Sequence, residues 1–137
     1  MTEAQTLDAI DAAIRDQGAS PPALVYVGSP YAGRGETPGE RKRDQERNVR
    51  FAIDAARALA ARGWTPILPH LMLPRYLDDR DWEQRGRGTR AGLKIMSICD
   101  AAVFLVPRWR DGPSDGMRTE IEEWKARSRS PLVFWVG

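Results

Sequence analysis

The residue of this sequence with the clearest chemical potential is a glutamate near the start of a helix. The segment 111–121 turns through glycine, proline and serine directly after the apolar run 101–106, which predicts a buried strand. Glu120 lies three residues after Met117 and four before Trp124, so its side chain falls on or beside the apolar helix face. A carboxylate at the edge where α/β sheets bind ligands is a candidate for catalysis.

The beginning of the same helix has features of a binding site. Ser114 is a residue type that caps helices, and the free N–H groups of a first turn favour an anion. We therefore expect Ser114, Asp115, Gly116 and Met117 to contact a ligand, and Met117 also to belong to the core.

Helical and strand patterns alternate along the chain, which predicts a parallel sheet with right-handed crossovers. The expected fold class is α/β: a single-domain Rossmann-like or flavodoxin-like parallel sheet of four to five strands, with helices on both faces. Residues 1–22 are expected to be an N-terminal helix and linker added to a domain at 23–137. The expected strands are 24–27, 64–70, 101–106 and 131–136, and the second should be an edge strand or a short one because it holds two prolines. The expected helices are 1–18, 48–62, 89–97 and one around Glu120 to about 127. The charged stretches 35–47 and 78–88 are expected to be a solvated loop with a helix start and a mobile loop, respectively.

Three loops should meet at the carboxyl edge of such a sheet: 28–35, 69–80 and 107–116. The first reads Gly-Ser-Pro-Tyr-Ala-Gly-Arg-Gly, whose glycines let a backbone approach a ligand closely. This loop matches neither the G-x-G-x-x-G pattern nor the phosphate-binding P-loop, so dinucleotide binding and Walker-type nucleotide binding are unsupported. The loops bring polar candidates toward Glu120: Ser29, Tyr31, Arg34 and His70.

Composition excludes several other classes of function. The chain has 137 residues, with 21 basic and 19 acidic side chains, an excess too small to indicate nucleic-acid binding. A single cysteine fits a reducing compartment, and a single histidine excludes a histidine-cluster metal site. No stretch resembles a membrane span or a signal peptide. We expect a cytoplasmic protein without metal or other cofactor and without nucleic-acid or membrane partners.

The order of motifs resembles the nucleoside 2-deoxyribosyltransferase superfamily over residues 24–137. Gly28-Ser29 followed by Gly33-Arg34 is similar to the G-S-x-x-G-G-R loop of 2′-deoxynucleoside 5′-monophosphate N-glycosidases. Ser114-x-Gly116-x-x-x-Glu120 is similar to their S-x-G-x-x-x-E segment, whose glutamate attacks the anomeric carbon. The chain also looks like small uncharacterised members of the superfamily.

The resemblance implies retaining N-glycosidic chemistry on a nucleoside 5′-monophosphate or a nucleoside. Glu120 would attack C1′ and form a covalent glycosyl ester, with Tyr31 near the nucleophile or the sugar. Ser29, Arg34 and Ser114 would hold the phosphate, and His70 would lie where the base or sugar passes. Members of the superfamily form dimers or larger homo-oligomers, so the resemblance also implies a homodimer or larger assembly.

The sequence departs from the family at the general acid. The N-glycosidases carry an aspartate eight residues before the Asp of their third strand, and that position is Gly92 here. Asp78, Asp79 or Asp81 could supply the proton from the neighbouring loop, with Asp79 as the chosen candidate, and Asp115 could assist. The alternatives are a transferase rather than a hydrolase, or a non-catalytic nucleotide-binding or sensing module on the same fold. A nucleic-acid binder would need a continuous basic face, which the interleaved acids oppose.

Overall fold

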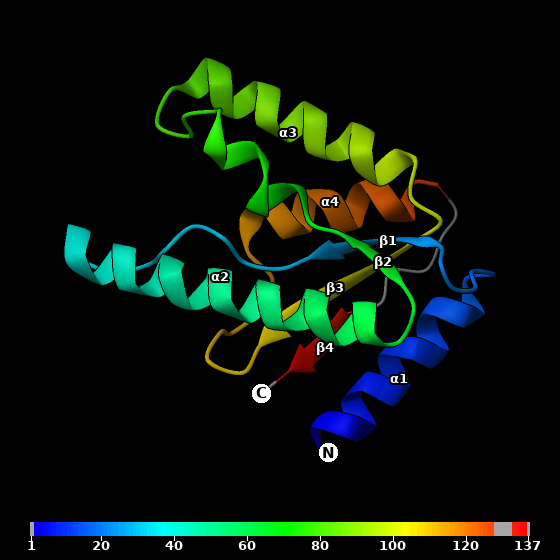
Figure 1. Cartoon of the computed structure of the whole chain (residues 1–137). Coiled ribbons are helices and arrows are strands. Elements are labelled where there is room, and N and C mark those ends of the chain that lie inside the picture. The colour runs from blue at the N-terminus through cyan, green and yellow to red at the C-terminus, as the bar shows by residue number, and fades with distance from the viewer. Residues whose placement is uncertain (1, 128–132, 137) are drawn as a thin grey trace.

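Helices alternate with strands along the chain and cover both faces of one sheet (Figure 1). The computed structural model describes residues 2–127 and 133–136. In chain order its elements are α1 (Glu3–Asp16), β1 (Leu24–Gly28), α2 (Pro38–Ala61), β2 (Thr65–Ile67), the 3-10 turns η1 (Pro69–Leu71) and η2 (Leu73–Arg75), α3 (Trp82–Ser97), β3 (Ala101–Pro107), α4 (Asp115–Lys125) and β4 (Val133–Val136).

The described strands form a parallel sheet in the order β2-β1-β3-β4. This order places the chain reversal between β1 and β3, which is the point at which doubly wound sheets bind ligands beyond the carboxyl ends of their strands. The predicted α/β class with a parallel sheet is confirmed, and its strand order is that of flavodoxin-like folds. The sheet therefore directs the loops after β1 and β3 toward one common site.

Alternating side chains of the central strands form two cores, one on each face of the sheet. Val25, Val27, Val103 and Leu105 pack against α1 and α2, whereas Tyr26, Ala102, Phe104 and Val106 pack against α3 and α4. Figure 1 shows the same two layers, with α3 and α4 on one side of the strands and α1 and α2 on the other. Both central strands are buried on both faces, which explains their continuous apolar sequences.

The N-terminal helix packs on the sheet as part of the same folded unit. Ile10 and Ile14 of α1 are buried in the core beside α2. Beyond the helix, the Gln17 side-chain amide donates to the carbonyl of Ala102 (3.0 Å) and its oxygen accepts the Ala102 N–H (3.1 Å). The chain directly after α1 is thereby attached to the start of β3.

Two helices begin earlier than the sequence pattern predicts. The expected loop at 35–47 is wrong from Pro38 onward, because Thr37 caps the helix and accepts the Glu40 N–H. The expected mobile loop at 78–88 is wrong from Trp82 onward, because Asp81 caps α3 by accepting the Glu83 N–H. In both segments the capping residue outweighs the dense charge that indicated a loop.

The strand predictions hold with changed bounds. The second strand is confirmed as an edge strand, but it is limited to Thr65–Ile67 rather than 64–70, because 3-10 turns follow it at once. The last strand covers Val133–Val136, and the first part of its predicted range, 131–132, lies outside the described residues.

Candidate functional site

Glu120 is held by a tyrosine of the neighbouring strand. The phenol of Tyr26 on β1 donates a hydrogen bond to Oε2 of Glu120 on α4. Tyr26 is fully buried and faces α4 because it alternates with Val25 and Val27, whereas Glu120 is half-buried. The two residues therefore form a fixed carboxylate–phenol pair on the α3/α4 side of the sheet.

Burial changes the acidity of both members of this pair. Burial raises the pKa of Glu120 to about 7, although the hydrogen bond from Tyr26 opposes this rise by favouring the carboxylate. Burial and the adjacent Glu120 charge raise the pKa of Tyr26, so the phenol stays protonated and remains the donor. Glu120 can thus exchange between acid and carboxylate near neutral pH, a property typical of catalytic carboxyl groups.

The loop after β1 and the turn after β2 are joined by Ser29 and His70. Ser29 Oγ lies 2.8 Å from His70 Nε2, and the Tyr31 ring lies edge-on to the imidazole with 6.4 Å between ring centroids. Burial lowers the pKa of His70 to about 4, so the ring is neutral at pH 7. A neutral imidazole can accept or donate a hydrogen bond here but carries no charge for a phosphate.

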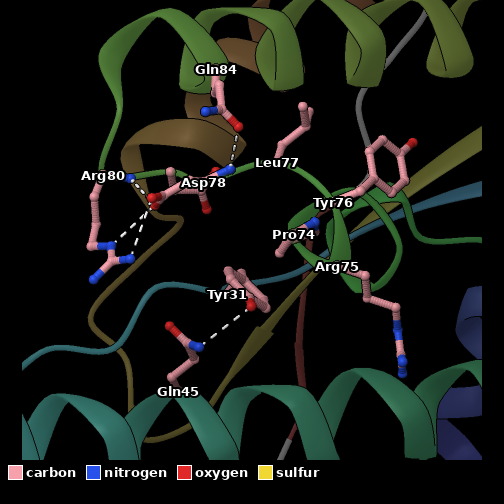
Figure 2. Close-up of a pocket in the computed structure, with 10 residues that line it drawn as sticks. Tyr31, Gln45, Pro74, Arg75, Tyr76, Leu77, Asp78, Arg80 and Gln84 are labelled. Atoms are coloured by element: carbon pink, nitrogen blue, oxygen red, sulfur yellow. Dashed lines mark hydrogen bonds and ion pairs between the residues drawn. The ribbon is translucent and has the colours of Figure 1, made fainter.

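An open groove of about 490 Å³ lies between α2 and the segment 74–84. In Figure 2, Tyr31 stands in this groove with its hydroxyl toward Gln45 of α2, and the chain from Pro74 to Arg80 forms the opposite wall. Burial and the Asp79 charge raise the pKa of Tyr31. Glu120 is not among the residues that line this groove.

The three candidate acids of this segment have different surroundings. Asp78 pairs with Arg80 and accepts its N–H, which lowers the pKa of Asp78, and Asp81 caps α3. Asp79 is exposed, lines the groove, and makes no hydrogen bond or ion pair among the described residues. Of the three, Asp79 is the side chain left available for a ligand in the groove.

The first turn of α4 is open to solvent. Ser114 Oγ accepts the Met117 N–H (3.3 Å), which confirms the expected N-cap. Asp115 and Gly116 are exposed, and a Cβ on Gly116 would meet no atom within 4 Å. Met117 is buried in the core beside α3, so its side chain contributes packing at this position.

Three polar side chains, here called the loop clasp, hold the loop after β1: the buried Asn48 of α2 and Arg110 of the β3–α4 loop, and the partly buried Asp44 of α2. Arg110 donates to the carbonyl of Ala32 and to Asp44 Oδ2, both at 3.1 Å. Asn48 Nδ2 donates to the carbonyls of residues 31 and 32 at 3.2 and 3.3 Å.

The position of Gly33 is set by α2. A Cβ at Gly33 would collide with the carbonyl oxygen of Arg41, so glycine is required here for contact with the helix. Next to it, the Arg34 N–H donates to Asp44 Oδ2 (2.8 Å), while the Arg34 side chain is exposed. Gly33 therefore has a packing requirement that is independent of the expected ligand approach.

A second cavity, of about 340 Å³, lies between α1 and α2. Apolar side chains dominate its lining, including Ile10, Phe51 and Trp109, and none of the predicted site residues reaches it.

Within the described ranges 2–127 and 133–136, no cluster of three His, Cys, Asp or Glu side chains could hold a metal ion. No helix in that part of the chain combines the length and apolarity needed to cross a bilayer.

Comparison with known families gives one match. A family model described as a domain of unknown function, DUF7768, matches residues 23–133. The chain belongs to this family. No curated protein and no solved structure matches the chain.

The matched range contains every residue of the predicted site, from Ser29 to Glu120. The structure brings Ser29, Tyr31 and His70 together and places Asp79 beside Tyr31. No hydrogen bond or ion pair within the described residues joins Glu120 to any of these four.

Sequence reasoning missed Tyr26 and the loop clasp. It named Tyr31 as the tyrosine near the nucleophile or the sugar and gave no role to Tyr26, which the structure places in direct contact with Glu120. The signal for Tyr26 is its alternation with two buried valines, which directs it to the α4 face. The signal in α2 is the four-residue spacing of Asp44, Asn48 and Ala52, which sets two polar groups in line with a core residue.

Proposed function

We propose that this protein is an N-glycosidase that cleaves or transfers the N-glycosidic bond of a nucleoside 5′-monophosphate or nucleoside. The observation that carries the proposal is the Tyr26–Glu120 pair. A half-buried carboxyl group with a pKa near 7 follows the strand β3 and is oriented by a buried phenol.

The pair suits nucleophilic attack on a sugar carbon. Tyr26 binds Oε2 of Glu120, which leaves Oε1 free to attack C1′. The transition state at C1′ resembles an oxocarbenium ion, so an adjacent anion stabilises it. The new C1′–O bond forms as the C1′–N bond breaks, and the base leaves with the bonding electron pair and gains a proton. Asp79 is the proposed proton donor, and water or a second base then resolves the glycosyl ester.

Several features support a phosphorylated substrate. The first turn of α4 offers free N–H groups, and the space around Gly116 is open. Arg34 adds an exposed positive charge on the loop after β1, and Ser114 retains a hydroxyl proton to donate. We include in this proposal a cytoplasmic location and a homodimer or larger assembly.

The test is release of free base from a panel of ribo- and deoxyribonucleoside 5′-monophosphates and their parent nucleosides. Wild-type protein is compared with Glu120→Gln, and Glu122→Gln serves as the control because Glu122 is exposed on the same helix. We expect one substrate to yield base, Glu120→Gln to lower the rate by at least about 10³-fold, and Glu122→Gln to retain it. Intact-mass spectrometry should detect a glycosyl adduct on the wild type alone.

One observation favours the second candidate, a nucleotide-binding module without catalysis. The groove that holds Asp79 does not include Glu120 among its lining residues. If every substrate stays intact while a nucleotide still raises the melting temperature, the binding module is the correct function.

A further inference from the structure

A buried ion pair lies directly beneath the loop that carries Tyr31 and Arg34. The side chains of Arg110 and Asp44 are only 3% and 10% exposed, and their charged atoms are 3.1 Å apart. They come from the β3–α4 loop and from α2, so the contact joins two elements that flank the reversal between β1 and β3.

Arg110 and Asp44 bind the backbone of the loop after β1 as well as each other. Arg110 Nη2 donates to the Ala32 carbonyl, and Asp44 Oδ2 accepts the Arg34 N–H at 2.8 Å. Burial alone would raise the pKa of Asp44, but the Arg34 N–H together with Arg47 and Arg110 lowers it, so the carboxylate remains charged. One ion pair therefore fixes a carbonyl and an N–H on either side of Gly33.

Stability alone is a weak reason for burying these charges. Removing two charges from water costs nearly as much as their attraction returns, and apolar replacements of similar volume are often equally stable. What an apolar pair could not do is satisfy the two backbone groups of residues 32 and 34.

We propose that Asp44 and Arg110 are positioning residues, which fix the backbone at 32–34 so that Tyr31 and Arg34 face a bound nucleotide. The inference rests on the proposed function for the identity of the ligand. Asn48 supports the same backbone through two carbonyls, and Gln45 holds the Tyr31 hydroxyl from the same helix.

The first measurement needs no ligand. Asp44→Leu/Arg110→Met removes both charges at once, and Arg47→Gln is the control because it removes the more exposed partner of the same carboxylate. Hydrogen exchange of the Arg34 amide should accelerate by about tenfold or more in the double variant, while amides of β3 keep their protection. Unchanged exchange at Arg34, or equal acceleration throughout the chain, would overturn the proposal.

The second measurement separates positioning from chemistry. With the monophosphate that is cleaved in the panel above, the double variant should raise KM by about tenfold or more and change kcat by less than about threefold. Arg110→Lys, which keeps the charge and three donors, should recover part of the KM. An unchanged KM in a double variant with a loosened loop would contradict the proposal. If the wild type releases no base, the proposed function fails, and Arg34 exchange still decides whether the pair holds the loop.

Discussion

Burial and the hydrogen bond from Tyr26 act in opposite directions on the charge state of Glu120. Burial favours the protonated acid, whereas the hydrogen bond from Tyr26 favours the carboxylate. The pKa near 7 is the result of these opposed effects, and a nucleophilic role requires the carboxylate. Activity should therefore rise with pH through about 7 in the wild type.

Tyr26→Phe should raise the pKa of Glu120 further, because the only group bonded to its carboxylate among the described residues is lost. We expect an increase of about one pKa unit, measured by NMR titration of the Glu120 side-chain carboxyl group. The rising limb of the pH–rate profile should move by the same amount.

Tyr76→Phe is the matched control, because Tyr76 is 62% exposed and its hydroxyl makes no hydrogen bond among the described residues. It should leave the Glu120 titration unchanged. An unaltered Glu120 pKa in Tyr26→Phe would show that burial alone sets it.

At the scale of elements, the loop after β1 depends on its contact with α2. Gly33 lies against the Arg41 carbonyl, and Asp44 and Asn48 bind the backbone on either side. The helix that carries them begins at Pro38, well before the apolar stripe, so the charged first half of α2 forms part of the candidate site.

Gly33→Ala should lower the free energy of unfolding by at least about 2 kcal/mol, because the new methyl group cannot coexist with the Arg41 carbonyl. Denaturant unfolding measures this loss. Gly116→Ala is the control in a helix, where open space and the higher helix propensity of alanine predict equal or greater stability. Equal stability of Gly33→Ala and wild type would mean that the loop does not rest on α2.

At the scale of the whole molecule, the titrations of Glu120 and His70 have opposite effects on the pH dependence of stability. The pKa of Glu120 is about 7 in the fold against an ordinary 4.5, so the fold binds the extra proton and stability falls as pH rises between these values. The pKa of His70 is about 4 against an ordinary 6.5, so the unfolded chain binds the extra proton and stability rises with pH in that range.

Wild-type stability should therefore vary little between about pH 5 and 6.5, since the two slopes offset. In Glu120→Gln the free energy of unfolding should rise with pH across this window, by about 1–3 kcal/mol, and in His70→Gln it should fall by a similar amount. Urea unfolding at four pH values measures both slopes. Parallel profiles for the three proteins would contradict the assigned pKa values.

The stability of the whole fold also depends on the N-terminal helix α1. The family match begins at residue 23, yet α1 buries Ile10 and Ile14 and Gln17 binds both backbone groups of Ala102. Deletion of residues 2–20 should expose the β3 face and abolish the cooperative thermal transition, followed by circular dichroism. A truncated chain that melts at the wild-type temperature would show that α1 is dispensable.

The sequence alone determined the fold class, the approximate places of β1 and β3, and the position of Glu120 in the second turn of α4. These depend on hydrophobic periodicity, turns and caps, which are local along the chain. Tertiary structure decided that Tyr26 binds Glu120, and that Asp44 and Arg110 hold the loop after β1. Those partners are 94 and 66 residues apart in sequence. A long charged or phenolic side chain has many solvated alternatives, and its partner is fixed only when neighbouring strands bring one within reach.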